Sequence, residues 1–486
     1  MLDRMATPPT RIGVFGIGLH AYWEQFPGLK GRLEGYQREV EAGLAAAGAE
    51  VVSAGLVDTA PAARTAGARF AAADLDLLVC YVGTYATSSQ VVPAVQHVGR
   101  PVLVLNLQPT PALDYERTNT AEWLANCCVC CVPELAGAFG RCGVPFNLVS
   151  GLLRREDGPE GERAWREIGD WVTAAGAARA LRTGRLGFLG HTYPGMLDLY
   201  SDPTMLTAQT GVHVETLEMD DLQARVDAAS DADVARHLDQ ARRLFMFSED
   251  SPSDPLARAP HPDDLAWAAR VSVGLDALRR DFALDALAYY YRGLDGNANE
   301  RLGAGMILGN TLLTGSGVPC AGEGDAKTAL AMLILDRLGG GGSFTEFCAM
   351  DFRDDFLLMG HDGPFHPGIA EGKPILRGLG LFHGKRGHGI SVEARVKTGP
   401  VTILTVSQTA DGRLRLLTAE GESLPGPTLR VGNTTSRIGF RMPPAEFVDR
   451  WCALGPTHHC ALGAGHHGAR IAKIGRILGL EVAWVA

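Results

Sequence analysis

Three polar side chains lie at the junctions between regular elements in the stretch from Cys320 to His361. The stretch begins Cys-Ala-Gly-Glu323-Gly-Asp-Ala-Lys-Thr, continues through an apolar helical run to Leu338 and a run of glycines, and then reads Ser-Phe-Thr-Glu346 and Leu-Leu-Met-Gly-His361. We expect Glu323 at or just before a helix N-terminus, Glu346 in or beside a strand from Ser343 to Met350, and His361 at a strand end. Carboxylates and imidazoles at such junctions suit a divalent cation with open coordination positions.

The same residues also have a structural interpretation. A glutamate in the first turn of a helix is favourable because of the helix dipole alone. A single histidine at a strand end is commonly a hydrogen-bonded surface residue. Residue types without structural context therefore leave both interpretations open.

A second group of histidines stands near the C-terminus, in Gly455-Pro-Thr-His458-His459-Cys-Ala-Leu-Gly-Ala-Gly465. A helical pattern from Ala469 to Leu478 follows, and then a strand from Leu480 to Val485. These imidazoles could join the two glutamates and His361 in one metal site.

Taken in order, these motifs resemble the L-arabinose isomerase and L-fucose isomerase superfamily, and the arabinose isomerase branch is the closer match. The resemblance rests on Ala-Gly-Glu323-Gly-Asp-x-Lys-Thr, on the glycine-rich approach to Ser-Phe-x-Glu346, on Gly-His361, and on His458-His459. It covers the central and C-terminal parts of the chain firmly and the N-terminal part loosely.

The resemblance implies a metal site with four ligands, which are Glu323, Glu346, His361 and His459. Glu323 and Glu346 would also be the catalytic acid/base pair. The ion would be Mn²⁺, or Co²⁺ or Mg²⁺. His458 would orient the substrate, although the two neighbouring histidines could have the reverse roles.

The function implied is that of a metal-dependent aldose–ketose isomerase. It would act on a pentose or a (deoxy)hexose by enediol proton transfer. The partner would be a small-molecule sugar, and the protein would be a homo-oligomer, a trimer or hexamer with shared active sites. Two alternatives stay open, a non-catalytic sugar-binding relative and a metal-dependent hydrolase on the same scaffold.

The pattern of the whole chain predicts an α/β protein. We expect two doubly wound parallel-sheet domains, with strands such as Arg11–Ile17 and Arg185–Gly190 alternating with helices. Short alternating strands after Gly378 predict a C-terminal antiparallel, β-barrel-like domain. The expected domains are residues 1–175, 176–340 and 341–486.

Several residues at the predicted strand ends could contact a substrate. His191 and Tyr291 follow or end strands of the second domain, and Arg292 comes next. In the resembling family the region around His20 and Tyr22 supplies substrate-contacting residues, and both match the family's residue types. The family's preceding glutamine is Leu19 here, and Cys127 to Cys131 stand where arabinose isomerases carry a glutamine and a histidine. These departures leave the identity of the sugar open.

Two further motifs allow competing interpretations. Cys127, Cys128, Cys130 and Cys131 could hint at zinc, but no second pair stands at a suitable spacing, so small buried thiols are the favoured interpretation. The basic, glycine-rich segment containing His383, Lys385 and Arg386 is either an exposed turn or an anion site for an acidic or sulfonated sugar. Gly13, Gly16 and Gly18 lack the order of the dinucleotide fingerprint.

Composition excludes several classes of protein. The 486 residues carry a formal net charge of −10, which disfavours general nucleic-acid binding. The sequence contains no apolar run of eighteen residues, so we expect no transmembrane helix. The N-terminus has no apolar signal core, and the cysteines are scattered outside the one cluster. We therefore expect a cytoplasmic protein with reduced thiols, no membrane partner and no nucleic-acid partner.

Overall fold

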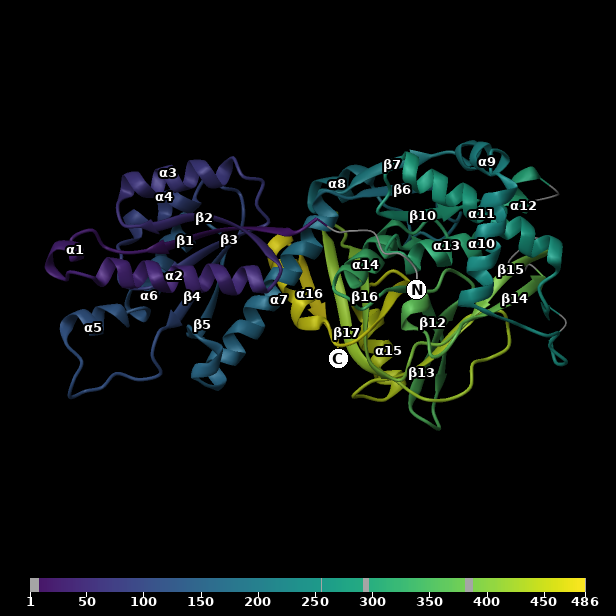
Figure 1. The fold of residues 1–486 in the computed structure, drawn as a ribbon. Helices are drawn as coiled ribbons and strands as arrows, with labels where there is room; N and C mark the ends of the chain where they lie inside the picture. Colours follow the sequence, from purple (N-terminus) through teal and green to yellow (C-terminus); the bar gives the residue numbers. More distant parts are fainter. Residues whose placement is uncertain (1–7, 255, 292–296, 381–387, 486) are drawn as a thin grey trace. The chain divides into compact units, whose positions relative to one another are not determined.

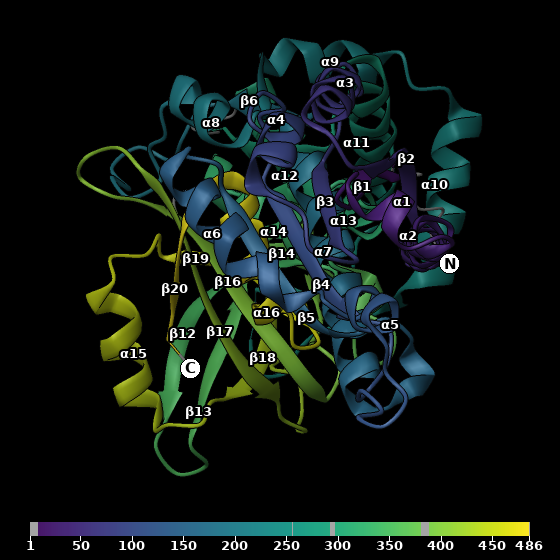
Figure 2. The same ribbon diagram turned by 90° about the vertical axis from the view of Figure 1, so that its left-hand side faces the viewer.

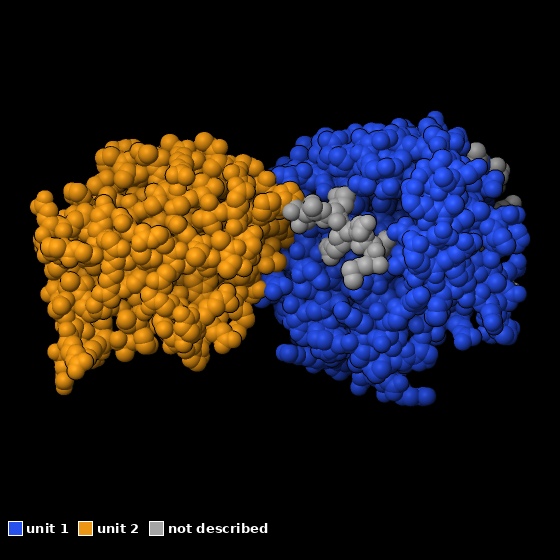
Figure 3. Space-filling model, viewed as in Figure 1, with its two compact units in different colours: residues 1–6, 180–486 blue, residues 7–179 orange. Residues whose placement is uncertain are grey.

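The computed structural model describes residues 8–254, 256–291, 297–380 and 388–485. The chain divides into two compact units, residues 7–179 and residues 180–486 (Figure 3). No helix within the described ranges is both long and apolar enough to cross a membrane.

A five-stranded parallel sheet forms the centre of the first unit. Its strand order is β2-β1-β3-β4-β5, which is the order of flavodoxin-like sheets. The expected parallel sheet is confirmed. The strands are β1 (Thr10–Ile17), β2 (Ala49–Val57), β3 (Leu77–Val82), β4 (Val102–Gln108) and β5 (Phe146–Leu152).

Helices cover this sheet because its strands are apolar on both faces. Phe15 and Ile17 of β1 share a core with α3, α4 and α6, and Figure 1 shows α2 on the other side of the sheet from α3. The helices are α1 (Tyr22–Gln25), α2 (Leu29–Ala46), α3 (Ala60–Ala71), α4 (Val92–Val95), α5 (Thr120–Ala125), α6 (Val132–Arg141) and α7 (Pro159–Arg182).

The sequence pattern does not predict β5. Its sequence, Phe-Asn-Leu-Val-Ser-Gly-Leu, has no continuous apolar run, and most of its residues are only partly buried. The glycine near its end is typical of a loop.

A second parallel sheet opens the unit of residues 180–486. Its order is β11-β10-β6-β7, and all three pairings are parallel, as expected. The strands are β6 (Arg185–Gly190), β7 (His213–Leu217), β10 (Ala286–Tyr290) and β11 (Cys320–Ala321). The helices of this part are α8 (Pro203–Thr210), α9 (Met219–Asp227), α10 (Asp231–Leu244), α11 (Pro262–Asp281), α12 (Ala298–Ala304), α13 (Met306–Gly315) and α14 (Ala326–Arg337).

Two helical features of this unit differ from the sequence pattern. The pattern from Leu222 to Phe247 includes α9 and α10, and a new N-cap, Ser230, separates them by accepting a hydrogen bond from the Asp233 N–H. The pattern does not predict α13, because this helix is buried all round and therefore has no amphipathic period.

The C-terminal part is a mixed, largely antiparallel β structure, as expected. Its order is β16-β19-β12-β13-β18-β17-β20, and β16 also pairs with β17, its long neighbour in Figure 2. Only β20 joins this sheet in parallel, along β17. A barrel-like closure stays a prediction. The strands are β12 (Ser343–Asp351), β13 (Phe356–His361), β16 (Gly399–Gln408), β17 (Leu414–Ser423), β18 (Thr434–Gly439), β19 (His459–Ala464) and β20 (Glu481–Trp484).

A small sheet and two helices complete the unit. The remaining elements are β8 (Met246–Phe247), β9 (Ala257–Arg258), β14 (Ile375–Gly380), β15 (His388–Glu393), α15 (Pro444–Ala453) and α16 (Gly468–Leu478). One core joins Ala268 of α11 and Leu308 of α13 to Val401 of β16 and Leu417 of β17. The parallel and β-rich parts of residues 180–486 therefore share buried apolar surface. The division into three domains stays a prediction.

Candidate metal centre

Two overlapping groups of potential metal ligands lie inside the unit of residues 180–486. One group is Glu323, His458 and His459, and the other is Glu346, His361 and His459. Within each group the ligand atoms lie within 4.8 Å of one another. His459 is common to both groups, so the structure gathers the four residues expected as ligands around one buried imidazole.

Glu323 lies in the loop between β11 and α14, at the carboxyl end of the parallel sheet. Its φ is +58° and that of Gly324 is +69°, so two consecutive residues adopt left-handed backbone. The Glu323 carbonyl accepts a hydrogen bond from the Tyr193 N–H (2.9 Å), and the Gly324 N–H donates to the Tyr289 carbonyl (3.0 Å). A non-glycine residue in this conformation costs about 1–3 kcal/mol, and such strain is found mainly at functional sites.

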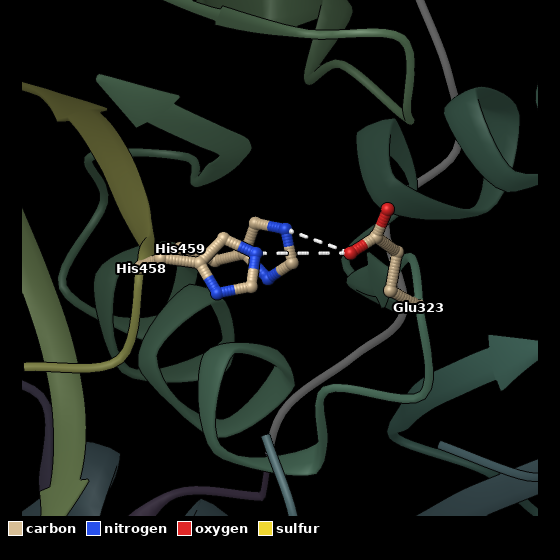
Figure 4. Close-up of side chains that lie close together, drawn as sticks. All are labelled: Glu323, His458 and His459. Atoms are coloured by element: carbon tan, nitrogen blue, oxygen red, sulfur yellow. Dashed lines mark ion pairs between the residues drawn. The ribbon is translucent and has the colours of Figure 1, made fainter. Parts of the chain in front are cut away.

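The Glu323 carboxylate faces both neighbouring histidines (Figure 4). Its Oε2 atom lies 3.4 Å from Nε2 of His459 and 3.7 Å from Nε2 of His458. Burial raises the pKa of Glu323, but the attraction of His458, whose Nε2 lies 3.7 Å away, and of the other nearby histidines lowers it by more, so the net shift is downward. The group is therefore a carboxylate at neutral pH.

Three adjacent strands position Glu346 and His361. In β12, Glu346 stands opposite His459 of β19 on one side and opposite Gly360 of β13 on the other. His361 is the last residue of β13. The buried ring of Phe344 packs 4.6 Å from the His361 ring and 4.3 Å from the His459 ring, measured between centroids. The register of the sheet therefore brings these side chains together, and Phe344 supports both imidazoles.

His459 is fully buried, and its tautomer follows from its partner. Its Nδ1 lies 3.1 Å from Oδ2 of Asp325. Asp325 is the N-cap of α14 and accepts hydrogen bonds from the N–H and the hydroxyl of Thr328. Burial raises the pKa of Asp325, but His459 and the other partners lower it by more, so the net shift is downward. Because an ionised carboxylate only accepts, Nδ1 of His459 carries the proton and Nε2 presents its lone pair to the site.

His458 has the opposite electrostatic environment. Its Nδ1 lies 2.7 Å from Oδ2 of Asp198, and the same oxygen accepts a hydrogen bond from the His458 backbone N–H at 2.9 Å. Burial lowers its pKa, but the neighbouring carboxylates of Glu323 and Asp198 raise it to about 9. For His459, by contrast, burial lowers the pKa and outweighs the effect of Asp325. One imidazole of the pair is therefore protonated at neutral pH and the other is neutral.

Lys327 connects α14 to the loop that carries Asp198. Its ammonium group is buried and donates to the carbonyls of Leu199 (3.1 Å) and Tyr200 (3.0 Å) and to the hydroxyl of Ser201 (2.9 Å). The Asp-x-Lys-Thr motif therefore fixes both carboxylates that hold the histidine pair, Asp325 directly and Asp198 through its loop.

A pocket opens beside this cluster. Glu323, His361 and Asp362 line it together with three consecutive tyrosines at the end of β10, Tyr289, Tyr290 and Tyr291. Asp362 Oδ1 lies 2.9 Å from Nδ1 of His361. Burial lowers the pKa of His361, but Asp362 raises it by more. Aromatic walls with a few convergent polar groups are typical of a small-molecule site.

The residues expected to contact a substrate fall in different places. Tyr291 lines the pocket with Glu323. His191 is exposed, lies edge-on to Tyr290 at 5.2 Å, and lines a separate hollow beside α8. The segment His383–Arg386 and Arg292 lie outside the described residues.

His20 and Tyr22 belong to the unit of residues 7–179. The exposed His20 ring has its Nδ1 3.9 Å from Asp58 Oδ2. Tyr22 packs edge-to-face against Phe26 at 6.1 Å. Their roles stay a prediction.

Sequence reasoning did not identify the carboxylates that hold the histidines. Asp325 had a usable signal, because an aspartate just before a helical pattern is a typical N-cap. Asp198 follows a strand of the parallel sheet within Pro-Gly-Met-Leu-Asp, a signal that many loops share. Asp362 directly follows His361, but nothing in the sequence shows that the two side chains meet.

A cation fits the observed donor set. Glu323 Oε2 and His459 Nε2 are buried, and neither makes a hydrogen bond within the described part of the chain. Buried polar atoms without partners cost about 1–3 kcal/mol each, so two of them facing one another need an explanation. A divalent cation coordinated by the carboxylate oxygen and the neutral imidazole nitrogen would satisfy both atoms. The residues present therefore suit a metal ion.

Comparison with known proteins confirms the resemblance read from the motifs. No protein-family model matches the chain. The L-arabinose isomerase of Nocardioides sp. is 24% identical over 417 residues, which cover 84% of this chain and 80% of that protein. The L-arabinose isomerase of Acidothermus cellulolyticus is 26% identical over 368 residues, covering 72% and 69%. The sulfoquinovose isomerase of Alkalicoccus urumqiensis is 26% identical over 328 residues, covering 67% and 70%.

Proposed function

We propose, from the similarity to sugar isomerases over most of its length, that this chain is a metal-dependent aldose–ketose isomerase. The observation that carries the proposal is the pair of ligand groups that share His459, together with the buried atoms of Glu323 and His459 that make no hydrogen bond among the described residues. Its substrate would be a pentose or a (deoxy)hexose. The names of the relatives include both an arabinose and a sulfoquinovose isomerase, so they do not select one sugar.

Glu323, Glu346, His361 and His459 would hold the cation. His459 suits this role better than His458, because a ligand must offer a lone pair and His459 is neutral with Nε2 free. Manganese, cobalt or magnesium suits two carboxylates and two imidazoles with open positions. When bound, the cation would stabilise the negative charge that develops as a proton leaves the sugar carbon.

The two glutamates would move the protons. An aldose–ketose interconversion transfers a proton between adjacent carbons and another between their oxygens. Glu323 is ionised and faces the pocket, so it can accept a proton. Glu346, which stands beside His459 in the sheet, would carry out the complementary transfer.

His458 would orient the sugar. Its Nδ1 is held by Asp198, its Nε2 points toward Glu323, and 35% of its side chain is exposed. A protonated imidazole in this position can donate a hydrogen bond from Nε2 to a sugar oxygen. Tyr291 would contact the sugar from the pocket wall. His191, His20 and Tyr22 are further candidates, the last two within a homo-oligomer, a trimer or hexamer, that shares its sites between subunits.

The experiment that tests this proposal compares chelator-treated protein with and without added Mn²⁺, Co²⁺ or Mg²⁺. The panel of sugars contains L-arabinose, L-fucose, D-galactose and sulfoquinovose, and ketose formation is followed by chromatography. We expect turnover of at least one sugar only when metal is present. Metal-independent turnover would contradict the metal requirement.

Two other results would change the interpretation. Tight metal binding together with sugar binding but no turnover would favour a sugar-binding protein. A chain that binds no divalent cation would contradict the proposed centre itself. Calorimetric titration with each cation separates these cases.

A further inference from the structure

Four cysteines lie in the short connection between α5 and α6 in the unit of residues 7–179. Figure 1 labels both helices. The cysteines form two overlapping Cys-x-x-Cys pairs. In the structure one pair is buried in the core and the other is accessible at the surface. The pairs are Cys127 with Cys130 and Cys128 with Cys131.

The inner pair belongs to the core. Cys128 and Cys131 are fully buried. The Cys128 Sγ lies 3.8 Å from the carbonyls of Gly83 and Leu107, and the Cys131 Sγ lies 3.7 Å from the carbonyl of Thr84. These thiols confirm the expectation of small buried thiols for one half of the cluster. Among the described residues, these sulfurs do not belong to a group of three or more potential ligand atoms close enough to hold one metal ion, so the geometry does not support zinc here.

The outer pair is accessible and in contact. The Sγ atoms of Cys127 and Cys130 lie 2.8 Å apart, with the Cys127 S–H donating to the Cys130 sulfur. Cys130 is exposed and Cys127 is partly exposed. The 3₁₀ turn Val129–Cys131 folds the chain back, so the side chains of residues three positions apart lie next to each other.

We propose that Cys127 and Cys130 are a redox site that forms a reversible intramolecular disulfide. The oxidant is an external disulfide, for example oxidised glutathione. The Cys130 thiolate attacks one sulfur of that disulfide, forms a mixed disulfide and releases one thiolate. Cys127 then loses its proton and displaces the second external thiolate. Two S–H bonds are replaced by one S–S bond, and the two electrons reduce the external disulfide to two thiols.

The environment assigns the order of the two thiols. Cys130 is the more exposed sulfur, so an external disulfide reaches it first. Burial raises the pKa of Cys127 to about 12, and the hydrogen bond to Cys130 adds to this effect. Cys127 therefore keeps its proton until Cys130 has reacted, and it acts as the resolving thiol.

The test uses the full-length protein, incubated with either dithiothreitol or oxidised glutathione, then acid-quenched, denatured and alkylated. Trypsin releases Thr118–Arg141, which carries all four thiols and excludes the exposed Cys142. After oxidation we expect this peptide to carry two alkyl groups, on Cys128 and Cys131, and a link between Cys127 and Cys130. Dithiothreitol should restore four alkylated thiols.

Two variants test whether the link is specific to Cys127 and Cys130. In Cys127→Ser, Cys130 should keep a glutathione adduct because the resolving thiol is gone. Cys142→Ser should form the same link as the unmodified chain. Four alkylated thiols after oxidation, a link between Cys128 and Cys131, or a persistent adduct on Cys130 of the unmodified chain would each overturn the proposal.

Discussion

Asp198 and His458 lie 260 positions apart in the chain, and one carboxylate oxygen of Asp198 holds both the backbone N–H and the ring Nδ1 of His458. The two contacts fix the ring in position and leave Nε2 directed at Glu323. On the buried side, Asp325 holds the ring Nδ1 of His459. A pair of neighbouring histidines is therefore oriented by two carboxylates from different loops.

We expect Asp198→Asn to lower kcat by about 10- to 100-fold, the range typical of residues that orient a functional histidine. The amide can still accept the backbone N–H but no longer stabilises a protonated His458. Because His459 keeps its own partner, Mn²⁺ affinity should change little. Steady-state kinetics and calorimetry measure the two quantities, and Asp239→Asn on the surface of α10 is the matched control. An unchanged kcat would show that Asp198 has no positioning role.

Glu323→Gln should reduce turnover by about 10²- to 10⁴-fold, the contribution typical of a general acid or base. The amide cannot accept a proton and is a poorer ligand than a carboxylate. The measurement is the rate of ketose formation at saturating metal, with circular dichroism as a check of folding. Glu446→Gln, on the exposed side of α15, should retain full activity. A fully active Glu323→Gln protein contradicts the proposed acid/base role.

Removal of the metal should lower the melting temperature. A cation that binds only the folded chain stabilises it by about 2.7 kcal/mol at a hundred times its dissociation constant. Its binding would also satisfy the buried atoms of Glu323 and His459. Differential scanning calorimetry of chelated protein, with Mn²⁺ added back in steps, measures the effect. The His459→Gln variant should show no such increase, and an equal increase in both proteins would place the cation elsewhere.

Lys327→Met should destabilise the fold and slow the reaction together. The methionine fills much of the same buried volume, but the carbonyls of Leu199 and Tyr200 lose their donor. An unsatisfied buried group costs about 1–3 kcal/mol, which urea unfolding can resolve. Because the same loop carries Asp198, kcat should also fall. Lys373→Met, at an exposed position, is the control, and a stable variant with full activity would contradict the anchoring role.

The sequence predicted the local environment of the candidate ligands well. The helical pattern that begins at Thr328 predicted that Glu323 precedes a helix, and α14 begins at Ala326. Apolar runs predicted the strands of Glu346 and His361 to within a residue or two. These features depend on contacts between near neighbours, so they can be read from periodicity and capping residues.

Burial was harder to predict than secondary structure. The strand-end position of His361 allowed a surface residue, yet the side chain is buried against Phe344 and paired with Asp362. The cysteine cluster divides into a buried pair and an accessible pair, although its members are adjacent in sequence. Local pattern does not determine which face of a short turn meets the core.

The sequence by itself determined the alternation of strands and helices, the glycine-flanked glutamates, the adjacent histidines and the similarity to sugar isomerases. Only the tertiary structure decided that β19 pairs with β12 so that His459 faces Glu346. It also decided that Asp198 and Asp325 hold the two histidines. Strand register and contacts between distant loops depend on how whole elements pack. One histidine is therefore left protonated and the other neutral, although the two are adjacent in the sequence.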